Sequence, residues 1–356
     1  MRKKAIIAMS GGVDSSVAAY IMKNNGYECI GATIKLFDKG NSLEDDNTCC
    51  SSKDIEDAKS TANGLGMPYY VYTCTDDFEE KVISEFVRAY QNGRTPNPCV
   101  ECNRHIKFKH LLAKAQELGY DFVVTGHYAR VVYDEKLGRY LLKKGIDETK
   151  DQSYVLYSLS QNQLAHILFP LGELSKARVR EIAEENGFVN AGKRDSQDIC
   201  FVPDGDYASF ISRHTKTENK SGNFVDTGGK VLGRHQGIVR YTIGQRKGLG
   251  ISFGRTLYVC KTCPDTNEVV LGDEENLFSR ECIAKNINLI AYDEIKEPLK
   301  VKAKLRYKHP EQPATVYKID DDTLKIVFDK PQRAITPGQS VVLYEGDVVV
   351  GGGTIC

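Results

Sequence analysis

The chain has 356 residues, more than a single hydrophobic core usually holds, so we expect two or three domains. Its 48 basic and 48 acidic residues cancel, so any nucleic-acid surface must be a local one. Eleven scattered cysteines do not match a small secreted disulfide scaffold. No segment approaches the ~20 apolar residues of a membrane helix, and the run at 5–9 is too short for a signal peptide, so we expect a cytoplasmic protein with no membrane partner.

The first third of the chain alternates between strand and helix patterns. Apolar runs predict strands at 4–9, 29–34, 69–72 and 122–125. Helical spacing of apolar residues predicts helices at 13–22, 55–65, 78–90 and 108–118. Strands separated by helices indicate an α/β fold with a doubly wound parallel sheet, whose ligands bind beyond the carboxyl ends of the strands. Residues 150–200 favour helices and are assigned to the same domain.

The second half of the chain has a different texture. From Gly222 onward, glycine is frequent and helical periodicity fades. Short strands are predicted at 301–307, 315–319, 324–328, 341–344 and 348–350, which favours a small β-barrel. We therefore predict an α/β domain at 1–210, a small central domain at 211–280 and a C-terminal β-barrel at 281–356.

A glycine-rich segment, residues 10–16, joins the first predicted strand to the first helix. Its glycines let backbone N–H groups approach an anion, and the helix N-terminus adds partial positive charge. The segment contains no lysine, so it is not a GxxxxGK[ST] loop. Asp14 could hold a Mg²⁺ ion that bridges phosphate oxygens, or it could simply cap the helix. The segment resembles the SGGxDS signature of the PP-loop ATP pyrophosphatases, which implies ATP binding and adenylation of a substrate oxygen.

Two cysteine-containing segments suggest which nucleophile would displace the adenylated oxygen. Cys102 lies after Pro96 and Pro98, which predict an extended segment, and just before a helix predicted to start near Arg104. That position and the cations Arg104 and Lys107 favour a thiolate. Cys200 stands in a polar segment that suits a reactive loop. One cysteine could carry sulfur as a persulfide, and a second could release the product by thiol–disulfide exchange.

Several blocks together resemble the tRNA-specific 2-thiouridylase family over essentially the whole chain. They are TPNPCVECNRHIKF, GHYAR, KDQSYVLY, DSQDICFVPDGDY, GRHQGIVRYTIGQRKGLGI and TPGQS. The resemblance implies a tRNA-uridine 2-sulfurtransferase, in which ATP adenylates O2 of the wobble uridine at position 34 and a cysteine persulfide replaces that oxygen with sulfur. It implies tRNAs of the Lys, Glu and Gln type as partners, with a cysteine desulfurase or a sulfur-relay protein as donor.

The same resemblance assigns roles to individual residues. Cys200 would carry the persulfide, and Cys102 would be the partner thiol that forms a disulfide with it after sulfur release. ATP would contact Ala8, Met9, Ser10, Gly11, Gly12, Val13, Asp14, Ser15, Leu36 and Gly126. The tRNA would contact Asn97, Pro98, Cys99, His127, Lys150, Asp151, Gln152, Arg306, Tyr307 and Gln339. Some members carry aspartate where this chain has Cys99, so no carboxylate is available there to act as a base.

Other chemistries remain open from the residues alone. Cys260 and Cys263, flanking a predicted hairpin, and the pair Cys99 and Cys102 are CxxC motifs, although their separation is far beyond that of a zinc knuckle. Cys99, Cys102 and Cys200 could instead hold an iron–sulfur cluster. An amide-forming PP-loop synthetase would need neither Cys102 nor Cys200. A non-catalytic RNA- or metal-binding protein would release no pyrophosphate.

Two clusters of cations predict where RNA would bind. No acidic residue lies between Asp226 and Asp265, where seven cations fall. These are Lys230, Arg234, Arg240, Arg246, Lys247, Arg255 and Lys261. The second cluster comprises Lys300, Lys302, Lys304, Arg306 and Lys308. Its members alternate along one predicted strand, so we expect them to share a face.

Overall fold

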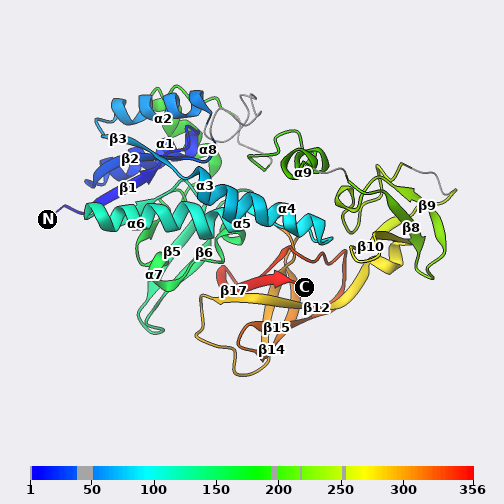
Figure 1. Ribbon diagram of the computed structural model, residues 1–356. Helices are drawn as coiled ribbons and strands as arrows, with labels where there is room; N and C mark the ends of the chain where they lie inside the picture. Colours follow the sequence, from blue (N-terminus) through cyan, green and yellow to red (C-terminus); the bar gives the residue numbers. More distant parts are fainter. Residues whose placement is uncertain (1, 38–50, 194–198, 217–218, 251–253) are drawn as a thin grey trace. The chain divides into compact units, whose positions relative to one another are not determined.

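The computed structural model describes residues 2–37, 51–193, 199–216, 219–250 and 254–356. Contacts divide the chain into two compact units (Figure 1). Unit 1 contains residues 1–82, 99–203 and 346–350, and unit 2 contains residues 83–98, 204–345 and 351–356. The three-domain boundaries stay a prediction.

Unit 1 is built on a parallel sheet with strand order β3-β2-β1-β4-β7. Its strands are β1 (Lys4–Ala8), β2 (Glu28–Lys35), β3 (Tyr69–Thr73), β4 (Phe122–Val124) and β7 (Ile167–Leu168). The chain runs outward from β1 to β3 and then returns to place β4 on the other side of β1. Ligands bind at such a reversal in open α/β sheets, beyond the carboxyl ends of the two strands. The predicted doubly wound sheet is thus confirmed.

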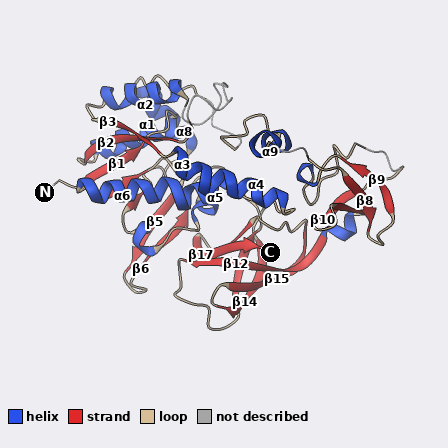
Figure 2. Ribbon diagram, viewed as in Figure 1, coloured by secondary structure: helices blue, strands red, loops and turns tan. Residues whose placement is uncertain are grey.

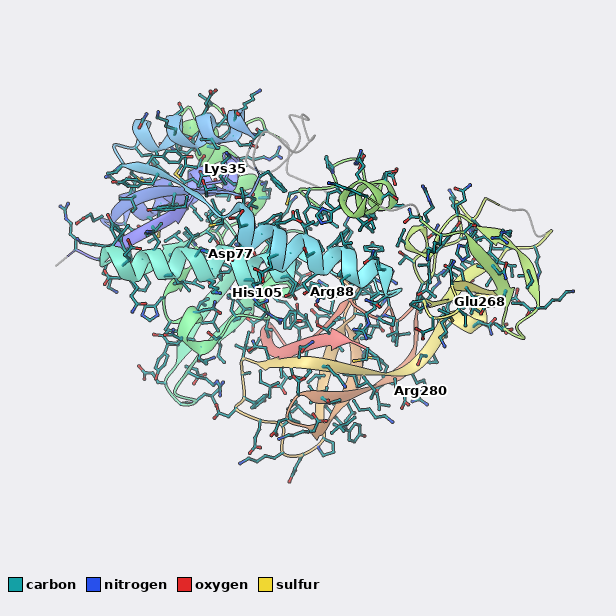
Figure 3. The ribbon with its side chains drawn as sticks, viewed as in Figure 1. Lys35, Asp77, Arg88, His105, Glu268 and Arg280 are labelled. Atoms are coloured by element: carbon teal, nitrogen blue, oxygen red, sulfur yellow. The ribbon has the colours of Figure 1, made fainter. Side chains whose placement is uncertain are left out.

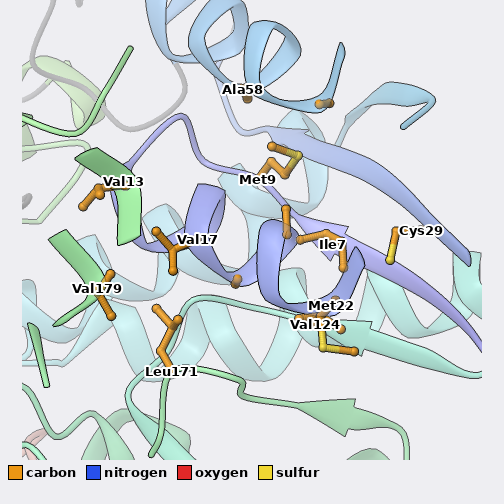
Figure 4. Close-up of a cluster of buried hydrophobic side chains, with 14 of the residues drawn as sticks. Ile7, Met9, Val13, Val17, Met22, Cys29, Ala58, Val124, Leu171 and Val179 are labelled. Carbon is orange, nitrogen blue, oxygen red and sulfur yellow. The ribbon is translucent and has the colours of Figure 1, made fainter. Parts of the chain in front are cut away.

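Helices cover both faces of this sheet (Figures 1 and 2). They are α1 (Val13–Asn24), α2 (Ser52–Gly64), α6 (Phe108–Leu118) and α8 (Lys176–Glu185). Ala5 and Ile7 of β1 belong to a core that includes side chains of α1, α2 and α8. Val17 of α1 and Val179 of α8 lie in this core near Leu171 (Figure 4). Strand residues alternate between faces, so Ile6 points to the opposite side, where α6 contacts β1 and β4.

Short helices fill the connections between these elements. They are α3 (Thr75–Phe78), the π-helix η1 (Glu79–Ile83), α4 (Ser84–Gln91), α5 (Pro98–Glu101), the π-helix η2 (Cys102–Lys107), the 3₁₀ helix η3 (Ser153–Leu156) and α7 (Gln161–Leu164). The predicted helix at 78–90 lies within an unbroken helical run at 75–91, in which α3, η1 and α4 follow one another directly and the hydrogen bonding changes from α to π and back. An antiparallel hairpin, β5 (Ala129–Asp134) and β6 (Arg139–Lys144), was not predicted. The expectation of helices through 150–200 was also too simple, because β7 lies within that span.

Unit 2 contains a small sheet of order β10-β11-β8-β9 and most of a β-barrel. The small sheet comprises β8 (Gly222–Asp226), β9 (Val231–His235), β10 (Tyr258–Cys263) and β11 (Glu268–Gly272), with α9 (Tyr207–Thr215), η4 (Ile238–Arg240) and η5 (Glu274–Leu277) as its helices. The barrel strands are β12 (Phe278–Leu289), β13 (Leu299–Lys304), β14 (Gln312–Asp320), β15 (Thr323–Arg333), β16 (Ser340–Glu345) and β17 (Val348–Ile355). Pairing of β12 with β17 closes the ring, which confirms the predicted barrel.

Candidate nucleotide and sulfur site

The glycine-rich segment lies at the carboxyl end of β1, where the strand order reverses. Gly11 has a positive φ of 74°, and a Cβ atom on it would lie 2.3 Å from the carbonyl oxygen of Asp54. The segment therefore lies directly against the first turn of α2. Gly12 is the N-cap of α1 and has no side chain to cap the first N–H groups, which leaves that end of the helix suited to an anion.

The loop after β4 closes against this segment. A Cβ on Gly126 would lie 2.8 Å from the carbonyl carbon of Asp14 and 2.9 Å from the backbone nitrogen of Ser15. Only glycine permits that approach. Lys35 is the last residue of β2 (Figure 3), and Leu36, which follows it, is buried. The residues predicted to contact ATP thus gather at one edge of the sheet.

Three side chains that were not predicted hold the segment in place. Lys176 lies 2.8 Å from both carboxylate oxygens of Asp14, and the Tyr128 hydroxyl donates to Asp14 Oδ1 at 2.7 Å. Asn190 donates to the Gly11 carbonyl at 3.0 Å and to the Ser16 hydroxyl at 2.9 Å. No motif spacing connects residues so distant in the chain, so sequence inspection had no signal for them.

A lysine clamp joins the segment to α2. Lys193 Nζ donates to the Gly11 carbonyl at 3.2 Å, to Asp54 Oδ1 at 2.5 Å and to Asp57 Oδ2 at 3.0 Å. Asp54 also completes a capping box with Ser51 at the start of α2. Partial burial lowers the pKa of Lys193, but the hydrogen bonds and charges of Asp54 and Asp57 outweigh it, so the pKa lies above its ordinary value. The clamp therefore stays charged and fixes the backbone of Gly11.

Both proposed sulfur-handling cysteines belong to unit 1. Cys102 is buried at the start of η2, and Cys200 is half-buried in a turn before Phe201. The ring of Phe201 packs on Phe78 of α3, with centroids 5.9 Å apart, and α3 in turn contacts η2. Asp77 of α3 (Figure 3) also lies 2.7 Å from His110 of α6. Residues 195–198, which precede Cys200 in the motif, lie outside the described residues.

The local environment of Cys102 differs from the predicted one. Residues 94–97, which include Pro96, are non-helical as predicted, but Pro98 begins α5 and the chain continues helically through η2 and α6, so the predicted extended segment ends before Cys102. Proline is tolerated in the first helical turn because its missing N–H would have no helical partner there. Arg104 lies 3.7 Å from Glu101, which offsets part of the positive charge expected to favour a thiolate.

Burial favours the protonated thiol at four cysteines elsewhere in the chain. Burial raises the pKa of Cys29 to about 11 and that of Cys282 to about 12. Burial also raises the pKa of Cys74 and of Cys260. Cys260 and Cys263 both lie within β10 rather than flanking a hairpin. Among the residues that the structure describes, no group of three or more His, Cys, Asp or Glu side chains is placed to hold a metal, so neither the zinc nor the iron–sulfur alternative gains support.

His127 follows Gly126 and lies among aromatic rings. Its ring contacts those of Phe108 and Phe169, and its Nδ1 lies 2.6 Å from the Thr125 hydroxyl. Burial, with a smaller effect of Lys107, lowers the pKa of His127 to about 3. The side chain is therefore neutral at physiological pH, and it would contact RNA as an uncharged ring.

This burial predicts an acid sensitivity. The folded-state pKa of His127 is below its ordinary value of about 6.5, so protons bind preferentially to the unfolded chain. The stabilisation is present above pH 6.5 and is lost as the pH falls toward 3. We expect His127→Asn to lower the melting temperature at pH 7 but to reduce its further fall between pH 7 and pH 4.5. His166→Asn, which changes an exposed histidine of the same unit, should keep the wild-type fall; equal slopes in all three proteins would contradict the prediction.

The residues predicted to contact tRNA lie in varied environments. The Asp151 carboxylate is buried and accepts from Gly145 and Ser153, and Gln152 Oε1 accepts from the Tyr128 backbone at 3.0 Å. In unit 2, the Gln339 amide donates to the carbonyl oxygens of Thr95 and Pro96, directly before Asn97. Tyr307 is partly exposed, with Lys304 Nζ 5.7 Å from the centre of its ring. Several of these side chains therefore support the backbone, and their RNA contacts stay predictions.

The two predicted cation clusters differ. All seven cations between 230 and 261 are exposed, although Arg255 pairs with Asp273 at 3.2 Å. The second cluster is only partly as predicted, because β13 ends at Lys304. Arg306 lies beyond the strand and donates to the carbonyl oxygens of Ile243 and Ala334 and to the Thr336 hydroxyl. The shared strand face therefore includes only Lys300, Lys302 and Lys304.

No described helix is both long and apolar enough to cross a membrane. Models of three protein-family domains match the chain: a tRNA methyl transferase HUP domain at 3–204, a tRNA methyl transferase PRC-barrel domain at 208–273 and an aminomethyltransferase beta-barrel domain at 279–355. A solved 4-thiouridine synthetase–RNA complex with bound ATP covers 56% of this chain and 45% of its own, at 18% identity and a TM-score of 0.38, a likeness too low to support any functional argument.

Curated relatives match over nearly their full length. The tRNA-specific 2-thiouridylase MnmA of Clostridioides difficile is 54% identical over 100% of this chain and 98% of its own. The MnmA of Clostridium acetobutylicum is 52% identical over 100% of both chains, and that of Acetivibrio thermocellus is 51% identical over 99% of both. With its HUP-type domain and two glycine loops meeting at the sheet edge, the chain belongs to the MnmA family of tRNA-specific 2-thiouridylases.

Proposed function

We propose that this protein is an ATP-dependent tRNA-uridine 2-sulfurtransferase that converts a uridine of tRNA to 2-thiouridine. The observation that carries the proposal is the junction of the Gly11 and Gly126 loops at the point of strand-order reversal, within the same compact unit as Cys102 and Cys200. The family relationship supplies the reaction. We place the reaction in the cytoplasm, where cellular thiols keep cysteines reduced.

ATP would occupy the edge of the sheet beside residues 8–15, with Leu36 and Gly126 at its sides. The residues fit a polyphosphate because glycine backbone and a helix N-terminus face the same edge, and a side chain on Gly11 or Gly126 would collide with neighbouring backbone. Asp14 supplies the carboxylate that Mg²⁺ prefers as a ligand. When bound, Mg²⁺ would neutralise charge on the phosphate oxygens. Asp14 would then have to exchange its present contact with Lys176.

The sulfur transfer would proceed in balanced steps. The uridine O2 attacks the α-phosphorus of ATP and pyrophosphate leaves. The terminal sulfur of a Cys200 persulfide then attacks C2 of the base, and AMP leaves with the original oxygen. The Cys102 thiolate attacks the Cys200 sulfur, which releases 2-thiouridine and leaves a Cys102–Cys200 disulfide. An external thiol reductant restores both cysteines, and a cysteine desulfurase or sulfur-relay protein reloads the persulfide.

The tRNA substrate would present an unstacked anticodon base. Single-stranded loop bases are the least costly to splay from their stack, which favours the wobble uridine at position 34. We propose tRNAs of the Lys, Glu and Gln type as substrates. Exposed cations between 230 and 261 would neutralise phosphates of the same tRNA.

Charge reversal on this surface tests the RNA contact. Arg246→Glu together with Lys247→Glu should weaken tRNA binding at least tenfold and lower the salt slope of log K by about 2, because two phosphate contacts are lost. Filter binding at several salt concentrations measures both quantities. Lys285→Glu with Lys296→Glu, a matched reversal at exposed positions outside this segment, should change neither. Equal effects of the two pairs would contradict a localised RNA surface.

A single reaction mixture tests the proposed function. The protein is incubated with ATP, Mg²⁺, a persulfide donor and unmodified tRNA, and digested nucleosides are analysed by mass spectrometry. We expect 2-thiouridine, with one AMP and one pyrophosphate for each sulfur transferred. Pyrophosphate without a thiolated nucleoside would favour the amide-forming alternative. Absence of both products, with tRNA still bound, would favour a binding protein.

A further inference from the structure

A short segment of unit 2, residues 93–97, connects α4 to α5 and ends at the first residue expected to contact the target base. Residues 94–97 are non-helical, and the two prolines at 96 and 98 have no backbone N–H to donate. The segment therefore forms no ladder of its own. Its half-buried carbonyl groups depend on donors from elsewhere in the unit.

A tight turn at 336–339 packs against this segment. Its central residues are Pro337 and Gly338, and Gly338 has a φ of 90°. The backbone N–H of the fourth residue donates to the carbonyl of the first at 3.2 Å, as in a type II turn. A Cβ on Gly338 would lie 3.0 Å from the backbone nitrogen of Thr95, whose N–H donates to the Pro337 carbonyl at 2.9 Å. Only glycine permits the turn to approach so closely.

The last residue of the turn completes the contact through its side chain. Gln339 Nε2 donates to the carbonyl oxygens of Thr95 at 2.8 Å and Pro96 at 3.3 Å. Carbonyl oxygens only accept hydrogen bonds, so the amide nitrogen must face them, and both of its N–H groups are used. The Gln339 carbonyl accepts from Ile355 of β17 at 2.8 Å, which fixes the backbone of this residue in the barrel. The barrel therefore holds the segment directly before Asn97.

A second donor holds the start of the segment. Thr262 of β10 is buried, and its hydroxyl donates to the Gly93 carbonyl at 2.7 Å. Gly93 has a φ of 64°, and a Cβ on it would lie 2.6 Å from that hydroxyl oxygen. Lys261, the preceding residue of β10, is exposed and is one of the cations proposed to bind tRNA phosphates. The strand proposed to bind RNA thus also supports the segment.

We propose that Gln339 and Thr262 are positioning residues for the target uridine, which hold residues 93–96 so that Asn97 and Pro98 meet the base in a fixed geometry. Gln339 acts on the reaction through the backbone of the segment rather than by touching tRNA. The inference rests on the proposed function, because it requires a target base beside Asn97. Displacing a reacting group costs rate, whereas tRNA affinity depends mainly on phosphate contacts.

A matched pair of glutamine variants tests the proposal. Gln339→Met removes both donors at similar size and should lower kcat for 2-thiouridine formation about tenfold or more, with the KM and the affinity for tRNA within twofold. Gln332→Met removes a buried amide of the same barrel, which donates to the Lys330 carbonyl at 2.8 Å. This control should lose a similar amount of thermal stability but keep kcat within twofold. Nucleoside mass analysis, filter binding and thermal denaturation measure these quantities.

Two results would overturn the inference. One is equal kcat in Gln339→Met and Gln332→Met, which would leave a structural hydrogen bond. The other is weaker tRNA binding by Gln339→Met with normal kcat at saturating tRNA, which would make Gln339 a direct RNA contact. Failure of the wild-type protein to form 2-thiouridine would instead overturn the proposed function.

Thr262 keeps the test decisive if Gln339→Met misfolds. Thr262→Val removes the hydroxyl at nearly constant volume and should lower kcat about threefold or more, with tRNA affinity unchanged. Thr262→Ser retains the donor and should restore most of the wild-type kcat. Equal kcat in the valine and serine variants would show that the hydrogen bond to Gly93 does not position the base.

Discussion

Cys200→Ser is expected to reduce 2-thiouridine formation by more than about a thousandfold, because a serine hydroxyl cannot carry the transferred sulfur. Nucleotide affinity should be unchanged, since the turn that contains Cys200 is anchored through Phe201 on Phe78 rather than through the glycine segment. Nucleoside mass analysis of the tRNA and calorimetry with ATP measure the two effects separately.

Cys102→Ser should give a different defect. Its product would stay attached to Cys200 as a mixed disulfide, so an external dithiol at millimolar concentration should restore turnover in Cys102→Ser but not in Cys200→Ser. Cys263→Ser, at a half-buried position in β10, serves as the control and should retain wild-type activity. Rescue of both active-site variants, or of neither, would contradict the proposed roles of Cys200 as the persulfide carrier and Cys102 as the thiol that releases the product.

Gly11→Ala is expected to lower ATP affinity by about a hundredfold or more and to lower the melting temperature. The backbone at Gly11 has φ of 74°, and the new methyl group would lie 2.3 Å from the Asp54 carbonyl oxygen. Both the strained conformation and the collision with backbone would displace the segment from α2. Calorimetry with ATP and thermal denaturation measure these effects.

Two further glycines calibrate that result. Gly126→Ala should also impair ATP binding, through collision with the backbone of Asp14 and Ser15. Gly64→Ala lies within α2 with no heavy atom within 4 Å of its added methyl group, so it should raise stability by roughly 0.5–1 kcal/mol and leave ATP affinity unchanged. Normal ATP binding by Gly11→Ala would show that the glycine-rich segment is not part of the nucleotide site.

The parallel sheet could be predicted because its signals are local. Continuous apolar runs identified β1 to β4 within one or two residues, and Gly119, with φ of 67°, ended α6 where predicted. By contrast, β7 has only two residues and exists because Ile167 pairs with Val123. The long strand β12 alternates poorly, so its pairing with β15 and β17 depends on partners distant in sequence.

The glycine loops were predictable for the same reason, because the residues that identify them are consecutive or directly follow a predicted strand. Lys176, Asn190 and Lys193 reach those loops only because α8 and the segment after it fold back onto α1 and α2. The prolines before Cys102 gave a wrong helix boundary. Proline breaks a helix when it lies in the interior, but Pro98 is the first residue of α5, where proline is tolerated. Arg306 looked like part of a strand face because its spacing continues that of β13, which ends two residues earlier.

The raised pKa values of Cys29 and Cys282, about 11 and about 12, affect which cysteines can accept sulfur from a persulfide. At neutral pH only about one molecule in ten thousand, or fewer, would have a thiolate at either position, and only a thiolate accepts sulfane sulfur readily. In the proposed reaction, these two thiols would therefore compete poorly for the sulfur of a persulfide donor. Because burial keeps these two thiols protonated and unreactive, the proposed persulfide would form selectively at another cysteine of this cysteine-rich chain.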